Sequence, residues 1–195
     1  HICQAIAFAH SREVLHRDLK PENVMIGAFG EVQTMDWGLV KVMGGADRAD
    51  DPHFIHSLED SPEATLEGQI AGTPLYMSPE QACGQVDRVD QRSDLYSLGA
   101  ILYRILTRRH YIMGDNVKAI LKLVKEKAPV PPHRIRVGYH RVSRELSAVC
   151  MKALAKDRDE RYQNVQELID DLELHQRGLP VSVYREPMLV RFWKF

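Results

Sequence analysis

The sequence contains few cysteines, and they lie far apart. Only three of its 195 residues are cysteine, at positions 3, 83 and 150, and no two of them form a C-x-x-C pair. This spacing argues against a disulfide framework and against a zinc site of the finger type. We therefore expect a reducing, cytosolic setting for this chain.

Long apolar runs and a large net charge are also missing. No apolar run approaches the roughly 18 residues that a membrane span requires. The 26 Lys and Arg residues nearly balance the 27 Asp and Glu residues, so the net charge is -1. Neither a nucleic acid nor a membrane surface is therefore expected as the main partner. The length, with 44% hydrophobic and 27% charged residues, fits one globular domain or large lobe with its own core.

Apolar periodicity predicts a largely helical chain. Ile2, Ala5, Ile6 and Ala9 recur at helical spacing, and stronger helical segments follow at about 92–107, 115–127, 143–155 and 163–176. Two short apolar runs, 24–26 and 32–35, flank Gly27 and Gly30 and predict a β-hairpin. Residues 44–71 lack periodicity and are acidic, which predicts a long loop.

One dense polar stretch carries recognisable chemistry. It reads His16-Arg17-Asp18-Leu19-Lys20-Pro21-Glu22-Asn23 and is followed by Asp36-Trp37-Gly38. A carboxylate, a cation, an amide and a second carboxylate in this order suit metal-assisted phosphoryl transfer. The predicted hairpin places Asn23 and Asp36 at neighbouring strand ends, close enough to share an ion.

On these motifs the chain resembles the protein kinase superfamily, and specifically the large lobe of bacterial eukaryotic-like (Hanks-type) serine/threonine kinases. The resemblance runs from residue 1 to about residue 176. It implies an α+β protein-kinase-like fold, of which residues 1–176 form a mainly α-helical large lobe with a short β-hairpin. Residues 177–195 are then a C-terminal tail whose basic residues are typical of a juxtamembrane stretch.

The resemblance also assigns roles around the polar stretch. Asp18 becomes the catalytic base that accepts the proton of the attacking hydroxyl, whereas alone it would be read as a turn-capping aspartate. Lys20, otherwise a solvated loop lysine, faces the transferring phosphate of ATP and is typical of serine/threonine kinases. Asn23 and Asp36 supply the hard oxygen ligands that Mg²⁺ prefers.

Further residues are expected to support this loop. The ring of His16 packs with the aromatic residue at 37, where Trp replaces the usual Phe, and Gly38 permits the turn that follows. Arg17 is expected to pair with a phosphorylated loop residue, for which the candidates are Ser57, Ser61 and Thr65. Alternatively, the loop's own acids, Glu63 and Glu67 among them, partly substitute for phosphate.

A second segment resembles the family's substrate-docking loop and runs from Gly72 to Glu80, with Ser-Pro-Glu in place of Ala-Pro-Glu. In it Thr73 is expected to bond to Asp18 and Lys20. Glu80 implies a buried ion pair with Arg161, although two unrelated surface charges are the simpler alternative. Asp94 is expected to accept hydrogen bonds from the backbone at His16 and Arg17, alongside a simple N-cap by Ser93.

Parts of a complete kinase are not found in these residues. No G-x-G-x-x-G motif occurs, only fifteen residues precede His16, and the chain begins with His rather than Met. We therefore expect a fragment that lacks the small lobe and is inactive alone. In this family a membrane helix often follows the kinase domain, so a longer parent is expected to be cytoplasmic, with an anchor outside these residues.

The predicted function is transfer of the ATP γ-phosphate to Ser and Thr hydroxyls of protein substrates. Two other functions remain open: a non-catalytic kinase-like interaction module, and a small-molecule phosphotransferase of similar fold. The docking loop argues against the second of these. The remaining histidines are interpreted as solvated surface residues rather than as a metal site, and these are His53, His56, His133 and His140. The arginines near them are interpreted as a solvated face rather than as a basic docking patch, and these are Arg134, Arg136, Arg141 and Arg144.

Overall fold

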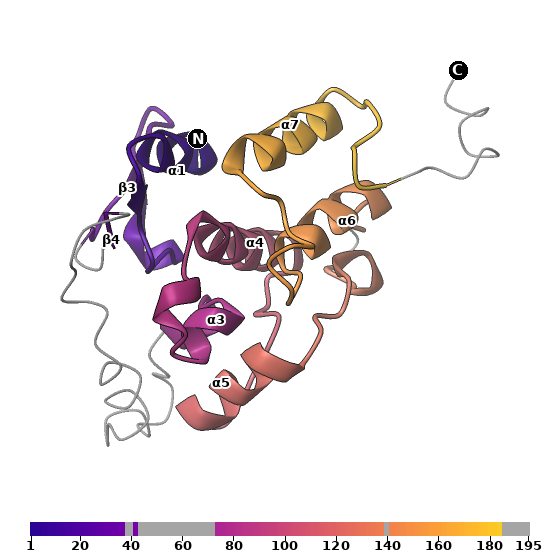
Figure 1. The fold of residues 1–195 in the computed structure, drawn as a ribbon. Helices are drawn as coiled ribbons and strands as arrows, with labels where there is room; N and C mark the ends of the chain where they lie inside the picture. The colour runs from indigo at the N-terminus through magenta and orange to yellow at the C-terminus, as the bar shows by residue number, and fades with distance from the viewer. Residues whose placement is uncertain (38–40, 43–72, 139–140, 185–195) are drawn as a thin grey trace.

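The computed structural model describes residues 1–37, 41–42, 73–138 and 141–184. In this part of the chain, helices dominate and two short antiparallel pairs of strands lie near the N-terminal end (Figure 1). The described residues thus form the mainly helical lobe with a short β-hairpin that the sequence predicts. The helices are α1 (Ile2–Ser11), α3 (Pro79–Ala82), α4 (Gln91–Thr107), α5 (Val117–Glu126), α6 (Arg144–Ala153) and α7 (Val165–Gln176).

The strands bracket the polar stretch found in the sequence. β2 (Val24–Ile26) pairs with β3 (Val32–Thr34), which confirms the predicted hairpin. β1 (Val14–Leu15) pairs with β4 (Lys41–Val42), and the sequence analysis did not anticipate this pair. Residues 16–23 therefore lie between two strands that are each held by a partner, so both ends of this loop are fixed.

The helix α4 forms the centre of the molecule (Figure 1). Asp90 caps its N-terminus by accepting a hydrogen bond from the backbone N–H of Arg92. Side chains on most of its faces are buried, as expected for a helix that other elements surround. Gly99 permits the close approach of α6, because a Cβ atom at this position would lie 2.8 Å from the Cβ of Ala153.

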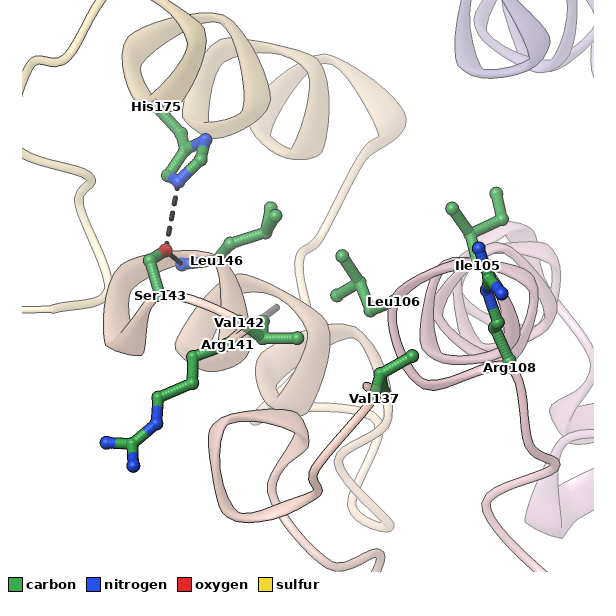
Figure 2. A pocket seen from close by; sticks show the side chains of 9 residues that line it. All are labelled: Ile105, Leu106, Arg108, Val137, Arg141, Val142, Ser143, Leu146 and His175. Carbon is green, nitrogen blue, oxygen red and sulfur yellow. Dashed lines mark hydrogen bonds between the residues drawn. The ribbon is translucent and has the colours of Figure 1, made fainter. Parts of the chain in front are cut away.

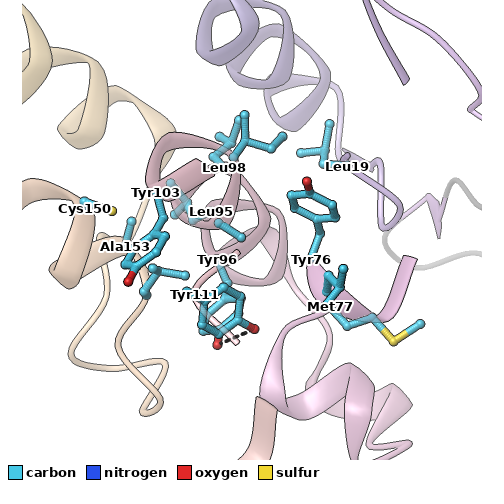
Figure 3. Close-up of a cluster of buried hydrophobic side chains, with 14 of the residues drawn as sticks. Leu19, Tyr76, Met77, Leu95, Tyr96, Leu98, Tyr103, Tyr111, Cys150 and Ala153 are labelled. Carbon is cyan, nitrogen blue, oxygen red and sulfur yellow. Dashed lines mark hydrogen bonds between the residues drawn. The ribbon is translucent and has the colours of Figure 1, made fainter. Parts of the chain in front are cut away.

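The core is built around α4 and is rich in tyrosine (Figure 3). Tyr96 and Tyr111 pack edge to face with ring centroids 5.9 Å apart, and the hydroxyl of Tyr96 donates to that of Tyr111 at 3.1 Å. Their polar atoms are thus paired inside the core, as buried hydroxyls need to be. Tyr103 also packs edge to face with Tyr111, with ring centroids 6.2 Å apart.

Residues beyond α7 also lie against the helices. Val181 is buried, and Asp171 of α7 accepts hydrogen bonds from the backbone N–H of Ser182 at 2.6 Å and from its hydroxyl at 2.8 Å. The hydroxyl of Tyr162 donates to the same carboxylate at 2.7 Å. Among the described residues, no helix is both long and apolar enough to cross a lipid bilayer.

Lys156 links α5 to α4 through a partly buried amine. Its Nζ donates to the hydroxyl of Tyr96 at 2.8 Å and to the carbonyl of Val124, in the last turn of α5, at 2.6 Å. Burial, aided by the charge of Arg161, lowers the pKa of Lys156 to about 8. The folded protein therefore holds a partly buried positive charge below this pH.

This arrangement predicts a pH-dependent stability difference between the wild type and Lys156→Met. Between about pH 8 and the pKa near 10.4 of an unperturbed lysine, the unfolded chain binds the proton that the folded chain has released. The free energy of unfolding of the wild type should therefore rise relative to the variant, by less than about 1.4 kcal/mol per pH unit. Urea denaturation at a series of pH values measures this difference. A constant difference across the range would contradict the prediction.

Candidate active site

The loop of residues 16–23 has a backbone that needs external support. Arg17 adopts a positive φ of 70°, which is unfavourable for a residue with a Cβ atom. The carboxylate of Asp94, on α4, accepts hydrogen bonds from the backbone N–H groups of His16 at 2.9 Å and Arg17 at 2.8 Å. Only 1% of Asp94 is exposed. A buried anion on the central helix thus holds the strained part of the loop.

His10 is a third partner of Asp94. The Nε2 atom of His10, on α1, lies 2.8 Å from Oδ2 of Asp94. A carboxylate only accepts, so the imidazole donates. The sequence analysis missed this residue. The one available signal was its position on the apolar face of the first helix, four residues after Ile6.

Replacing His10 with alanine should disturb the loop through Asp94. The carboxylate loses one of its three donors in a buried setting, which typically costs about 1–3 kcal/mol. In a catalytically complete form of the protein, we expect kcat to fall about tenfold with little change in the KM for ATP. His10→Gln retains a donor of similar reach and should recover most of the loss. Equal losses in both variants would contradict this positioning role.

Asp18 lies at the centre of a cluster of polar side chains. Its Oδ2 accepts from Nζ of Lys20 at 2.8 Å and from Nδ2 of Asn23 at 3.2 Å. Asn23 also donates to the backbone carbonyl of Asp18 at 2.9 Å. Asp18 is only 9% exposed. The structure therefore brings together three of the residues that the sequence analysis singled out.

Asp36 lies next to this cluster along the hairpin. The N–H of Met35 donates to the carbonyl of Asn23 at 2.8 Å, so the hairpin pairing extends to the residue before Asp36. Asp36 has a positive φ of 57° and an exposed side chain. This left-handed backbone conformation is unfavourable for a residue with a Cβ atom.

The side-chain oxygen atoms of Asn23 and Asp36 are of the type that binds a hard cation. The amide nitrogen of Asn23 is bonded to Asp18, so its carbonyl oxygen is the atom that remains for a ligand. Together with the carboxylate of Asp36 it offers oxygen atoms alone, which is the set that Mg²⁺ favours. Among the described residues, no group of three or more His, Cys, Asp or Glu side chains is placed to hold a metal by itself.

Trp37 fits beside the loop despite its size. Its ring centroid lies 4.6 Å from that of His16, and its indole Nε1 donates to the carbonyl of Thr34 at 3.1 Å. The indole N–H thus has a partner within the hairpin. Trp37 remains 37% exposed, whereas His16 is fully buried. Gly38, the next residue, lies outside the described residues.

The segment 73–82 is attached to the same loop. Ser78 caps α3 in a reciprocal arrangement with Gln81, and Nε2 of Gln81 donates to the carbonyl of Arg17 at 2.8 Å. The backbone of Thr73 begins a 3₁₀ turn, Thr73–Leu75, but its side chain lies outside what the structure describes. The candidate phosphorylation sites Ser57, Ser61 and Thr65 also lie outside the described residues.

Glu80 and Arg161 form a buried bidentate ion pair. Nη1 and Nη2 of Arg161 donate to Oε1 and Oε2 of Glu80 at 2.8 and 2.9 Å. The hydroxyl of Ser93 donates to Oε1 at 2.6 Å. Burial alone would raise the pKa of Glu80, but the hydrogen bonds and charge of Arg161, with the bond from Ser93, hold it below its usual value. The pair connects α3 to the segment before α7.

One pocket among the described residues lies away from this cluster (Figure 2). It has a volume of about 420 Å³ and lies between the end of α4, the start of α6 and the end of α7. Its walls are mostly aliphatic. Ser143 lies 3.0 Å from Nε2 of His175, and its hydroxyl oxygen accepts from the backbone N–H of Leu146 at 3.1 Å. It contains no residue of the loop 16–23, so the polar cluster around Asp18 is the better candidate for catalysis.

Comparison with known proteins agrees with this geometry. A family model described as protein kinase domain matches residues 1–172. The chain is 40% identical over 178 residues to serine/threonine-protein kinase PknD of Protochlamydia amoebophila, a match that covers 91% of this chain and 18% of that protein. It is 38% identical over 178 residues to PknB of Mycobacterium leprae, covering 91% of this chain and 25% of that protein.

A third relative, PknB of Mycolicibacterium smegmatis, is 39% identical over 179 residues, which cover 91% of this chain and 26% of that protein. The chain thus spans about a fifth to a quarter of the length of these relatives. The family match covers most of the chain, and each of these relatives aligns with 91% of it. The chain therefore belongs to the protein kinase domain family.

Proposed function

We propose that this chain supplies the catalytic loop, the metal ligands and the substrate platform of a serine/threonine protein kinase. The observation that carries the proposal is the cluster in which Lys20 and Asn23 both bond to the carboxylate of Asp18. A base, a cation and an amide ligand within hydrogen-bonding distance of one another are what phosphoryl transfer to a hydroxyl requires.

Each residue has a distinct part in the proposed reaction. Asp18 orients the substrate hydroxyl and accepts its proton while the oxygen bonds to the γ-phosphorus of ATP and the bond between that phosphorus and ADP breaks. Lys20 moves from Asp18 toward the transferring phosphate and holds its negative charge. Asn23 and Asp36 would hold Mg²⁺, which supplies further neutralisation of the phosphate oxygens when bound. The strained loop, held by Asp94, keeps these groups in position.

The proposed reaction also needs a second set of elements that binds the ATP phosphates. A Gly-rich loop and a strand lysine perform this task in kinases, and no G-x-G-x-x-G occurs in the 195 residues. The test therefore uses a chimera in which these residues follow the small lobe of the PknD relative. We expect Mg²⁺-dependent transfer of the γ-phosphate of ATP to Ser and Thr of a protein substrate.

The same assay on the 195 residues alone should show essentially no transfer. A folded chimera without activity would contradict the catalytic proposal and favour a binding role. Strong activity of the 195 residues alone would contradict the need for a second lobe. A cytoplasmic location, a juxtamembrane role for residues 177–195 and an anchor in a longer parent remain predictions.

A further inference from the structure

Gln81 joins two segments that lie far apart in the sequence. Its Oε1 accepts hydrogen bonds from the backbone N–H of Ser78 at 3.1 Å and from the hydroxyl of Ser78 at 3.0 Å. Its Nε2 donates to the carbonyl of Arg17, 64 positions earlier, at 2.8 Å. A backbone N–H only donates and a carbonyl only accepts, so these partners fix which end of the amide faces each of them. One side chain thus connects the start of α3 to the loop that carries Asp18.

The helix cap uses only one end of this amide. The oxygen completes the capping box with Ser78, and a glutamate at the same position would complete it equally well, since the box accepts Glu or Gln. The nitrogen has no part in the cap. Among the described contacts of this side chain, only the one with Arg17 therefore requires a glutamine, and its effect lies in the loop rather than in the helix.

Gln81 binds the loop at its strained residue. Arg17 has a positive φ of 70°, and the two N–H groups bonded to Asp94 lie in the peptide planes before its Cα atom. The carbonyl of Arg17 lies in the rigid peptide plane after it, which also contains the N–H of Asp18. Asp94 therefore holds the chain before the strained residue, and Gln81 holds it after. The position of Asp18 depends on both contacts.

The other end of this contact is itself held in place. The substrate platform, residues 73–82, is bonded to α4 by two serine hydroxyls. That of Ser97 donates to a backbone carbonyl of the platform at 2.8 Å, and that of Ser93 donates to a carboxylate of the platform at 2.6 Å. Asp94, which holds the loop, lies between these two serines in the sequence of α4. Gln81 thus connects two segments that one helix already holds, so a shift of either segment is transmitted to the other.

We propose that Gln81 is a positioning residue for the catalytic base, which couples the orientation of Asp18 to the placement of the substrate platform. This inference rests on the proposed kinase function. In the described contacts, Gln81 reaches Asp18 only through the peptide group that precedes it. A displacement of about 1 Å at a catalytic group can cost about 10²-fold in rate, so a bond that fixes this peptide group affects kcat. Order in the platform is thereby transmitted to the base.

The variant Gln81→Glu separates the two contacts of the side chain. Its carboxylate keeps an oxygen that caps α3 but cannot donate to the carbonyl of Arg17. In the chimera, kcat should fall at least about tenfold, while the KM values for ATP and peptide change little. The unfolding midpoint should stay close to that of the wild type, because the cap is complete. A purely structural role would not produce this combination.

Two further variants serve as controls. Gln85→Glu makes the same chemical change at an exposed position, where Oε1 of Gln85 accepts from Nη1 of Arg88 at 3.0 Å. A carboxylate keeps that bond, so this variant should retain the wild-type kcat. Ser78→Ala does the reverse of Gln81→Glu, because it removes the hydroxyl of the cap and leaves the amide. It should lower the unfolding midpoint more, and kcat less, than Gln81→Glu does.

Hydrogen exchange tests the contact without any phosphoryl transfer. In the 195-residue chain, mass spectrometry follows the exchange of the backbone amides of His16 and Arg17, which are bonded to Asp94. Gln81→Glu should speed this exchange about tenfold, because the loop opens more often once its carbonyl is released, and should leave the exchange of α6 unchanged. Faster exchange in a chain whose chimera is inactive would support the contact while refuting catalysis.

Three results would overturn the inference. They are a kcat of Gln81→Glu within about twofold of the wild type in an active chimera, a loss of kcat accompanied by an unfolding midpoint as low as that of Ser78→Ala, and unchanged exchange at His16 and Arg17. Each of them leaves the proposed kinase function intact wherever the wild-type chimera transfers phosphate.

Discussion

Replacing Asp18 with asparagine is expected to lower the rate of phosphoryl transfer by about 10²- to 10⁴-fold, the usual contribution of a positioned general base. Asparagine has the same shape but cannot accept the proton of the attacking hydroxyl. The loss should appear in kcat, measured on the chimera with a small lobe, while the KM for peptide changes little. Binding of ATP with Mg²⁺ should persist, because Asn23 and Asp36 are unchanged.

The matched control for this variant is Asp87→Asn. Asp87 is an exposed aspartate in the turn Val86–Arg88, outside the polar cluster around Asp18, so activity should be retained. The unfolding midpoint of Asp18→Asn should stay close to that of the wild type. If Asp18→Asn kept more than about a tenth of the wild-type kcat, the assignment of Asp18 as the base would be wrong.

Sequence patterns predicted the parts of this fold that repeat regularly or carry a motif. The helix α4 was predicted over 92–107 and runs over Gln91–Thr107, because its apolar residues recur at helical spacing. The hairpin followed from two short apolar runs around glycines. Glu80 and Arg161 lie 81 positions apart, so only the family resemblance pointed to their contact.

Contacts without a local pattern could not be predicted. His10 is one polar residue on a short helix, and nothing near it in the sequence indicates a carboxylate 84 positions away. Lys156 bonds to the carbonyl of Val124, a backbone group that has no sequence signature. Ser182 lies beyond Pro180 in a stretch without periodicity, yet it bonds to Asp171. Such contacts depend on the packing of elements distant in the chain.

Replacing Arg161 with methionine should lower the free energy of unfolding by about 3–5 kcal/mol, because it leaves the buried carboxylate of Glu80 without its counter-charge. The side chains of Arg161 and Glu80 are 0% and 3% exposed, so water cannot replace the lost partner. Arg161 also donates to the carbonyls of Ala155 and Arg92, at 2.8 and 2.9 Å. Urea denaturation measures the loss.

A surface pair provides the control. Arg92 bonds to Asp159, whose side chain is 83% exposed, and Asp159→Ala should change the free energy of unfolding by about 1 kcal/mol or less. The double variant Arg161→Met with Glu80→Leu removes both charges. It should recover part of the loss, since a buried pair replaced by apolar residues is often close to neutral.

At acidic pH the free energies of unfolding of the wild type and Arg161→Met should differ less than at neutral pH. The pKa of Glu80 is lowered in the folded wild type, so its stabilising contribution is present above the usual carboxyl pKa and is lost as the pH falls through the folded value. In the variant, burial without Arg161 favours the neutral carboxyl, and protonation removes the stranded charge. A loss of stability that is equal at acidic and neutral pH would instead assign the effect to packing or to the freed carbonyls of Ala155 and Arg92. The ion pair would then have no part in holding α3, and with it the substrate platform, to the rest of the lobe.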